Sequence, residues 1–194
     1  MPKIIALTGA KGSGKDTVAG IIKAKYDNVA TVAFADPIKN VIQHIFQLDT
    51  QSNDEYDRLK RSDLSALSPD GDTEVPWVTW KHIPGRHVVR EIGMLMRSYN
   101  EKQFTEYVED QFKQHPDKMW VITDLRFDNE YTMLKKWNAK IIKINRPYYE
   151  YDGHITERGF DDHLVHKIIL NDGSMEFLNT RVSVVMESLI KEWQ

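Results

Sequence analysis

One stretch near the N-terminus decides the fold: Lys3-Ile4-Ile5-Ala6-Leu7-Thr8-Gly9-Ala10-Lys11-Gly12-Ser13-Gly14-Lys15. Its first six residues form a short apolar run that suits a strand buried on both faces. The glycines let the next residues wind so that their N–H groups point inward, and a helix expected from Gly14 to about Tyr26 adds a partial positive charge. Lys15 can then reach the β- and γ-phosphates of a nucleotide. The stretch therefore predicts a phosphate-binding loop, or P-loop.

The residue after Lys15 departs from the usual pattern of such a loop. A serine or threonine hydroxyl normally ligates Mg²⁺ at that place, whereas this chain has Asp16 followed by Thr17. Asp16 could supply a carboxylate oxygen to Mg²⁺, directly or through water. The alternative is that Asp16 is only a favourable anion in the first turn of a helix. We expect the nucleotide-binding residues of the loop to be Gly9, Ala10, Lys11, Gly12, Ser13, Gly14, Lys15, Asp16 and Thr17.

A second acid, Asp124, ends the apolar run from Met119. Ligands of open parallel sheets bind at that end of a strand. Leu125 and Arg126 come next, and the glutamate that often activates water beside this aspartate in hydrolytic P-loop proteins is missing. We therefore expect transfer to an acceptor other than water, with Asp124 as a catalytic, Mg²⁺-binding carboxylate and Arg126 gripping an acceptor phosphate bidentately. The alternative is a strand-end ion pair that holds the next helix.

Four further bases are candidate site residues. Lys39 starts the helix after the second expected strand, and Arg90 lies near the start of a later helix. Each could bind an acceptor phosphate, although a base in such a position, taken alone, is more often a solvated surface residue. Arg146 ends the fourth expected strand, and Arg158 lies in the loop that follows. A lid that carries a base would exclude water and neutralise charge on the transferred group.

Three ring-bearing side chains have weaker functional interpretations. Trp77 and Trp80 lie in a polar stretch, where they could stack on a nucleobase or simply pin a loop to the core. His154 is not expected to act as a general base, because a phosphate acceptor is already ionised.

Strands that alternate with helices predict an α/β fold, with a five-stranded parallel sheet covered by helices on both faces. The other expected strands are 29–34, 119–124, 140–145 and 167–170, and the other expected helices are 37–46, 88–112 with a break at 98–100, 129–138, and one that opens after 171–174. Residues 1–194 are expected to form a single kinase domain. It would carry a polar excursion at about 50–86, on the acceptor side, and a lid loop at about 146–165.

Composition limits the other classes of function. The 194 residues carry a net charge of −3, which gives no global electrostatic reason to bind nucleic acid or an anionic membrane. The absence of cysteine excludes a disulfide framework and thiolate zinc sites. No apolar run approaches the ~20 residues that span a bilayer, so we expect a cytoplasmic protein.

Several motifs, in collinear order over most of the chain, resemble the deoxynucleoside monophosphate kinases of tailed bacteriophages. The most specific are Ser13-Gly14-Lys15-Asp16 and His154-Ile155-Thr156-Glu157. The others are Gly9, Thr17, Pro37-Ile38-Lys39, Asp124-x-Arg126, Asn145-Arg146-Pro147 and Asn171-Asp172-Gly173-Ser174. Phosphomevalonate kinases resemble the chain more distantly, through a Gly-Lys-Asp loop and an Asp-x-Arg element.

The resemblance implies an NMP-kinase-like P-loop NTPase fold, ATP and Mg²⁺ as cosubstrates, and a deoxynucleoside monophosphate as acceptor. Lys15 and the loop amides would hold ATP phosphates, whereas Lys39, Arg90 and Arg126 would hold the acceptor phosphate. Arg146 would lie at the adenine or lid side, and Asn171 and Gly173 beside the adenine. One departure is Leu95-Met96-Arg97, where family members have Leu-Gly-Thr, on the presumed acceptor side.

Two alternatives to this function stay open on the sequence. One is a different metabolite kinase, such as one that acts on phosphomevalonate. The other is a nucleotide-dependent switch, which is disfavoured because the chain has no Asn-Lys-x-Asp element for reading guanine. Base preference, sugar preference and a possible homodimer also stay open.

Overall fold

The structure is a computed structural model, and it describes residues 1–49, 54–61, 85–147 and 160–193. The chain divides into two compact units. The first comprises residues 1–34 and 105–194, and the second comprises residues 35–104. We describe each unit by itself, and the expectation of one kinase domain over 1–194 stays a prediction.

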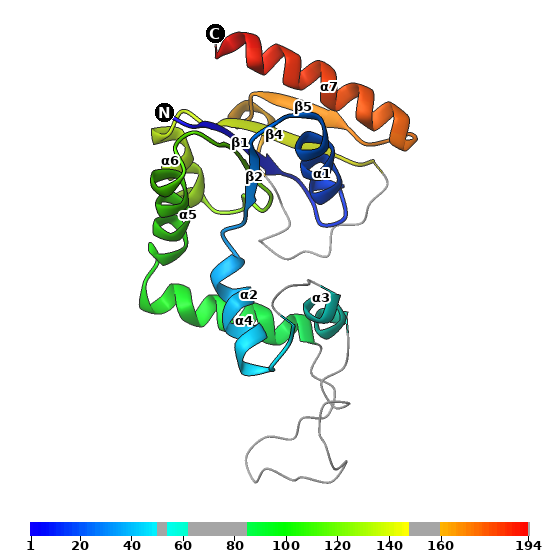
Figure 1. The fold of residues 1–194 in the computed structure, drawn as a ribbon. Coiled ribbons are helices and arrows are strands. Elements are labelled where there is room, and N and C mark those ends of the chain that lie inside the picture. Colours follow the sequence, from blue (N-terminus) through cyan, green and yellow to red (C-terminus); the bar gives the residue numbers. More distant parts are fainter. Residues whose placement is uncertain (50–53, 62–84, 148–159, 194) are drawn as a thin grey trace, which may run out of the picture. The chain divides into compact units, whose positions relative to one another are not determined.

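The first unit is built on a five-stranded, wholly parallel sheet with the strand order β2-β3-β1-β4-β5 (Figure 1). The strands are β1 (Lys3–Thr8), β2 (Val29–Val32), β3 (Met119–Ile122), β4 (Lys140–Asn145) and β5 (Lys167–Leu170). All five begin where the sequence predicts them, and three of them also end there. β1 is the central strand, and five of its six residues are buried, which is why it reads as a continuous apolar run.

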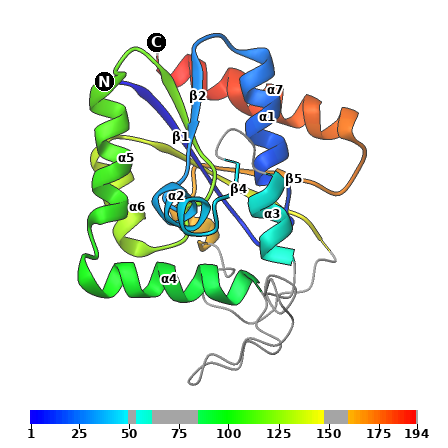
Figure 2. The ribbon, with the colours of Figure 1, turned by 60° about the horizontal axis from the view of Figure 1, so that its bottom comes forward.

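Helices cover both faces of this sheet, as Figure 2 shows. The helices of the unit are α1 (Lys15–Lys25), α5 (Gln103–Gln114), α6 (Asp128–Lys136) and α7 (Met175–Glu192), together with the 3₁₀ turn η3 (Asp162–Leu164). On one face, α1 and α7 share a core with Ile5, Leu7 and Ile142 of the sheet. On the other face, Phe112 of α5 packs its ring against Trp120 of β3 and Trp137 after α6. The predicted α/β class with helices on both faces is confirmed.

Two strands end earlier than the sequence predicts. β2 stops at Val32 and β3 at Ile122, two residues short of the expected ends in both cases. The last backbone bond of the pair joins the Thr123 N–H to the Val32 carbonyl at 3.3 Å. Beyond it the Asp124 carboxylate accepts the N–H of Phe34 at 2.8 Å. A side-chain acceptor thus replaces the backbone ladder, and the chain turns away from the sheet.

The second unit consists of helices α2 (Asp36–Ile45), α3 (Asp54–Arg61) and α4 (Gly85–Tyr99). Helix α3 lies inside the range expected as a polar excursion, yet it buries Tyr56 and Leu59. The sequence does not predict this helix, because six of its eight residues are charged and the segment reads as polar. α4 packs closely on the rest of the unit: a Cβ on Gly85 would lie 1.9 Å from the Leu59 carbonyl oxygen. A break between α4 and α5 is present as predicted, but it lies at 100–102 and not at 98–100.

The described helices include none long and apolar enough to cross a membrane.

The end of β1 is joined to the segment that follows β3. The buried Thr8 hydroxyl donates to the Leu125 carbonyl at 3.1 Å, and the Leu125 N–H donates to the Leu7 carbonyl at 3.3 Å. Because Thr8 precedes Gly9 and Leu125 follows Asp124, these bonds hold the start of the glycine loop beside the strand-end aspartate.

We predict that Thr8→Val lowers the free energy of unfolding by about 1–3 kcal/mol, because a near-isosteric methyl leaves the buried Leu125 carbonyl without this donor. Chemical denaturation measures the change. The matched control is Thr180→Val, which removes an exposed hydroxyl bond to the Glu176 carbonyl and should change stability by less than about 0.5 kcal/mol. Equal effects in the two variants would contradict the prediction.

Candidate active site

The loop from Gly9 to Lys15 is a tight turn that only glycine permits at several positions. Gly9, Gly12 and Gly14 have φ values of 136°, 72° and 103°, in the region that L side chains avoid. The space around two of them is also closed. A Cβ on Gly9 would lie 2.3 Å from the Ile144 carbonyl oxygen, and one on Gly14 would lie 2.5 Å from Asn171 Nδ2. The loop therefore runs close against the ends of β4 and β5.

Lys15 is folded over this loop. Its Nζ donates to the carbonyl oxygens of Gly9 and Ala10, each at 2.8 Å, and the residue is only 9% exposed. Lys15 is also the first residue of α1, whose N-terminus adds partial positive charge at the same place. Gly14 is the N-cap residue of this helix, and no side chain caps the helix there. The ammonium group and the helix terminus together make the loop suited to a polyanion.

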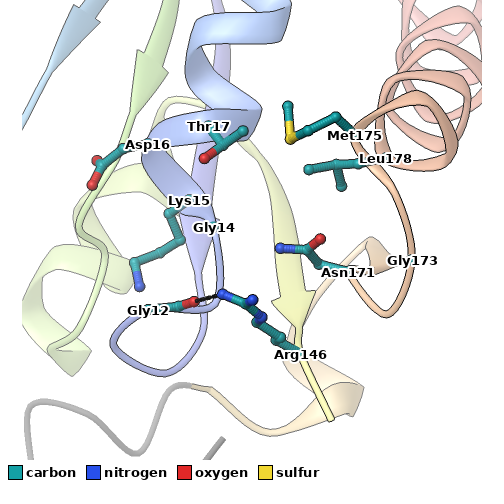
Figure 3. A pocket seen from close by; sticks show the side chains of 10 residues that line it. All are labelled: Gly12, Gly14, Lys15, Asp16, Thr17, Arg146, Asn171, Gly173, Met175 and Leu178. Carbon is teal, nitrogen blue, oxygen red and sulfur yellow. Dashed lines mark hydrogen bonds between the residues drawn. The ribbon is translucent and has the colours of Figure 1, made fainter.

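A pocket of about 460 Å³ opens beside the loop (Figure 3). Lys15 and Asp16 line it from the first turn of α1, and Met175 and Leu178 line it from α7. Its remaining lining residues are Gly12, Gly14, Thr17, Arg146, Asn171 and Gly173. In Figure 3 the Asp16 and Lys15 side chains lie on one side of the pocket, with Met175 and Leu178 on the other. Eight residues predicted to bind nucleotide are therefore brought together.

Two of these residues hold the outer side of the loop through its carbonyl groups. Arg146, just after β4, donates from Nη1 to the Gly12 carbonyl at 3.1 Å, the bond drawn in Figure 3. Asn171, just after β5, donates from Nδ2 to the Ser13 carbonyl at 2.8 Å. β4 neighbours β1 and β5 neighbours β4, so the order of strands in the sheet brings both side chains to the loop.

Asp124 and Arg126 lie in a short segment between β3 and α6. Asp124 is half-buried and accepts the Phe34 N–H, whereas Arg126 is exposed. The buried carboxylate of Glu130 holds this segment, because it accepts the backbone N–H groups of Arg126 at 2.9 Å and Phe127 at 3.1 Å. Asp124 thus has a fixed backbone at the carboxyl end of the sheet.

The sequence interpretation missed Met175 and Leu178 as pocket residues. Leu178 belongs to the buried stripe of α7, whereas Met175 is 57% exposed at the first position of that helix. Helical spacing predicts Met175 as part of the same buried stripe as Leu178, and that prediction is wrong, because the structure leaves Met175 exposed at the pocket. The sequence interpretation also missed Glu130 and Arg181 as supports of the site, because their effect depends on contacts made only in the fold. Arg181 donates to the Leu170 carbonyl and to the Asp172 carboxylate, on either side of Asn171.

The residues present fit a magnesium ion shared with a nucleotide. Mg²⁺ is commonly held by one or two carboxylates together with substrate phosphates and water, not by a protein cage. Asp16 offers an exposed carboxylate beside Lys15, and Asp124 lies at the end of a neighbouring strand. Within the described ranges no three or more His, Asp or Glu side chains are grouped so that they could hold a metal ion by themselves.

The remaining predicted residues are not joined to this pocket by the structure. Lys39 lies on α2 and Arg90 on α4, both in the second unit. Arg158, His154, Trp77 and Trp80 lie outside the described residues.

The parallel sheet, the glycine loop and the basic pocket beside it define a P-loop kinase of NMP-kinase-like fold. A solved structure, dephospho-CoA kinase from Campylobacter jejuni, shares this fold, with a TM-score of 0.53, 16% identity and full coverage of both chains.

The family follows from comparison of sequences. The family model described as "Deoxynucleotide monophosphate kinase" matches residues 3–103 and 85–182, and the chain belongs to that family. The enzyme of Enterobacteria phage T4 is 25% identical over 242 aligned residues that cover 96% of this chain and all of that protein. A protein of Acanthamoeba polyphaga mimivirus named for the same activity is 27% identical over 157 residues, which cover 74% of each chain.

The predicted family and activity are thereby confirmed. The chain is a kinase that uses ATP as phosphate donor and a deoxynucleoside monophosphate as acceptor. The alternatives of a phosphomevalonate-type kinase and of a nucleotide-dependent switch are not favoured. The roles of individual site residues stay predictions.

We predict that Gly9→Ala lowers the free energy of unfolding by at least about 2 kcal/mol, because a methyl group would meet a backbone oxygen at an unfavourable φ. The matched control is Gly20→Ala in α1, where no atom lies within 4 Å of the added Cβ. That change should stabilise the helix by about 0.5–1 kcal/mol. Thermal and urea unfolding measure both variants, and a neutral Gly9→Ala would contradict the geometry of the loop.

Proposed function

We propose that this kinase holds the phosphates of ATP in the loop from Gly9 to Lys15 and transfers the γ-phosphoryl group to the phosphate of a deoxynucleoside monophosphate. The observation that carries the proposal is the position of Lys15, whose ammonium group lies over a loop wound from positive-φ glycines and beside a pocket of suitable size. Ligand pockets usually enclose about 300–1,000 Å³.

In the proposed reaction an oxygen of the acceptor phosphate attacks the γ-phosphorus in line. A bond forms between that oxygen and the γ-phosphorus, and the bond from the γ-phosphorus to the β–γ bridging oxygen breaks, which releases ADP. The protein mainly positions the two phosphates and stabilises charge. The ammonium group of Lys15 stays close to the β- and γ-phosphates during the transfer. Arg146 and Arg126 add positive charge near the transferred group.

Asp16 and Asp124 would hold Mg²⁺ between them and the phosphates of ATP. When bound, the ion would neutralise charge on the β- and γ-phosphate oxygens. Asp124 is suited to this role because its backbone neighbours are fixed by Thr8 and Glu130. Asp16, in the first turn of α1, would act directly or through a water molecule.

For the acceptor side we propose Lys39, Arg90 and Arg126 as ligands of the acceptor phosphate, with Arg158 carried by a lid at about 146–165. This assignment rests on the family pattern and on charge: an arginine can grip a phosphate bidentately. Residues 1–194 would act as one kinase domain. Because its relatives are viral and its substrates are intracellular metabolites, we propose that it works in the host cytoplasm.

The experiment that tests the function is a coupled ADP-release assay with ATP and Mg²⁺. The acceptors are the four deoxynucleoside monophosphates, the corresponding ribonucleotides and phosphomevalonate. We expect turnover with at least one deoxynucleoside monophosphate and none with phosphomevalonate. ADP release that does not depend on any nucleoside monophosphate would overturn the proposal.

The catalytic roles predict specific kinetic losses. Lys15→Ala and Asp124→Asn should each lower kcat by at least about 10²-fold, because each removes charge from the transferred group or its metal. Asparagine can still accept the Phe34 N–H, so the second variant should keep its thermal stability. Lys23→Ala, on the exposed side of α1, is the control and should turn over like the wild type. Turnover near the wild-type rate in either site variant would refute that role.

A further inference from the structure

We propose that Asn171 is a positioning residue of the phosphate loop: its side-chain amide fixes the peptide plane between Ser13 and Gly14, and an Arg181–Asp172 clamp fixes Asn171 in turn. The inference rests on the proposed function, because it requires the loop to hold nucleotide phosphates. It assigns to Asn171 a role different from the adenine contact that the sequence resemblance implies.

The argument begins with a peptide plane. Asn171 Nδ2 donates to the Ser13 carbonyl at 2.8 Å. All described peptide bonds are trans, and in a trans peptide the C=O of one residue and the N–H of the next point in opposite directions. Holding the Ser13 carbonyl toward Asn171 therefore turns the Gly14 N–H away from Asn171, to the side that we propose receives the phosphate. Inward N–H groups are what a phosphate requires there.

Glycine makes this restraint necessary. Gly14 has a φ of 103°, and a glycine can adopt several other backbone conformations at little cost. Without the contact from Asn171 the plane before Gly14 would be less restrained. Asn171 also lies directly against this glycine, since a Cβ on Gly14 would come within 2.5 Å of Nδ2. Figure 3 shows the Asn171 amide directed toward Gly14.

Asn171 is itself held on three sides. Its backbone N–H donates to the Asn145 carbonyl at 2.7 Å, which ties it to the end of β4. Arg181 of α7 donates from Nη1 to the Leu170 carbonyl at 2.6 Å and to the Asp172 carboxylate. These two acceptors flank Asn171 in the chain. The hydrogen bond from Arg181 also holds the pKa of Asp172 below its usual value, so the clamp is charged at neutral pH.

The competing role for Asn171 is direct contact with the base, because the same side chain lines the pocket. The two roles differ in what a substitution does. A base contact affects ligands that carry a base, whatever their phosphates. A loop-positioning contact affects ligands that carry a polyphosphate, whether or not a base is attached.

The experiment measures dissociation constants by calorimetry for inorganic tripolyphosphate, ADP and adenosine, and steady-state constants for ATP and the acceptor. Asn171→Ala should weaken the binding of tripolyphosphate and of ADP by the same factor, about tenfold. This is the loss expected for one misdirected hydrogen bond to a charged group. The KM for ATP should rise with it, while adenosine affinity and the KM for the acceptor stay unchanged.

Two variants of the clamp separate positioning from simple electrostatics. Arg181→Met removes a positive charge and Asp172→Ala removes a negative one, yet both release the segment that carries Asn171. Both variants should therefore bind tripolyphosphate more weakly. A purely electrostatic effect would instead weaken binding in Arg181→Met and strengthen it in Asp172→Ala. Arg181→Lys should restore part of the affinity. The control is Lys140→Met, which breaks the ion pair with Glu192 near the C-terminal end of α7 and should leave tripolyphosphate affinity unchanged.

The outcomes also separate the two proposals. The positioning role is wrong if Asn171→Ala binds tripolyphosphate like the wild type, or if it loses as much affinity for adenosine as for ADP. The kinase function stands in either case. If the wild type binds tripolyphosphate but phosphorylates no deoxynucleoside monophosphate, the proposed function fails while the same titrations still decide the role of Asn171. A wild type that does not bind tripolyphosphate overturns both.

Discussion

The structure of the site depends on one backbone constraint: the residues from Gly9 to Lys15 must turn tightly while they run against the ends of β4 and β5. A chain with side chains at Gly9 or Gly14 could not follow this path, because the space is taken by the Ile144 carbonyl and the Asn171 amide. The carbonyl groups displaced to the outside then need donors. Arg146 and Asn171 supply two of them, so the glycine loop and its two outer supports form one arrangement.

The topology of the sheet explains why these supports come from distant parts of the sequence. In a parallel sheet the carboxyl ends of all strands lie at one edge, and ligands bind there. β1 lies between β3 and β4, with β5 next to β4. Asp124, Arg146 and Asn171 follow β3, β4 and β5, and each therefore emerges near the loop that follows β1. Thr8 and Glu130 stabilise this edge through bonds to the segment from Asp124 to Phe127.

Fold and family rest on different kinds of likeness. The likeness to dephospho-CoA kinase extends over the whole chain at 16% identity, which establishes architecture and carries no substrate with it. The family match, over residues 3–103 and 85–182, assigns the chemistry. The pocket has two sides: the residues of the glycine loop, which suit any nucleoside triphosphate, and the side formed by β5 and α7. Arg181 belongs to that second side, since its bonds to Leu170 and Asp172 shape the segment that reaches the loop.

The sequence alone determined the phosphate loop, the five strands and the aspartate at the end of β3, because each depends on local patterns: glycine spacing, short apolar runs and the residue that follows a strand. Three features were decided only by tertiary structure. α3 is masked by its charges and is recognisable only once Tyr56 and Leu59 are seen to be buried. β2 and β3 end early because a carboxylate distant in sequence accepts the Phe34 N–H. Asn171 turns its amide toward the Ser13 carbonyl because β4 and β5 bring two segments together across more than 150 residues of chain, and local sequence contains no record of such a contact.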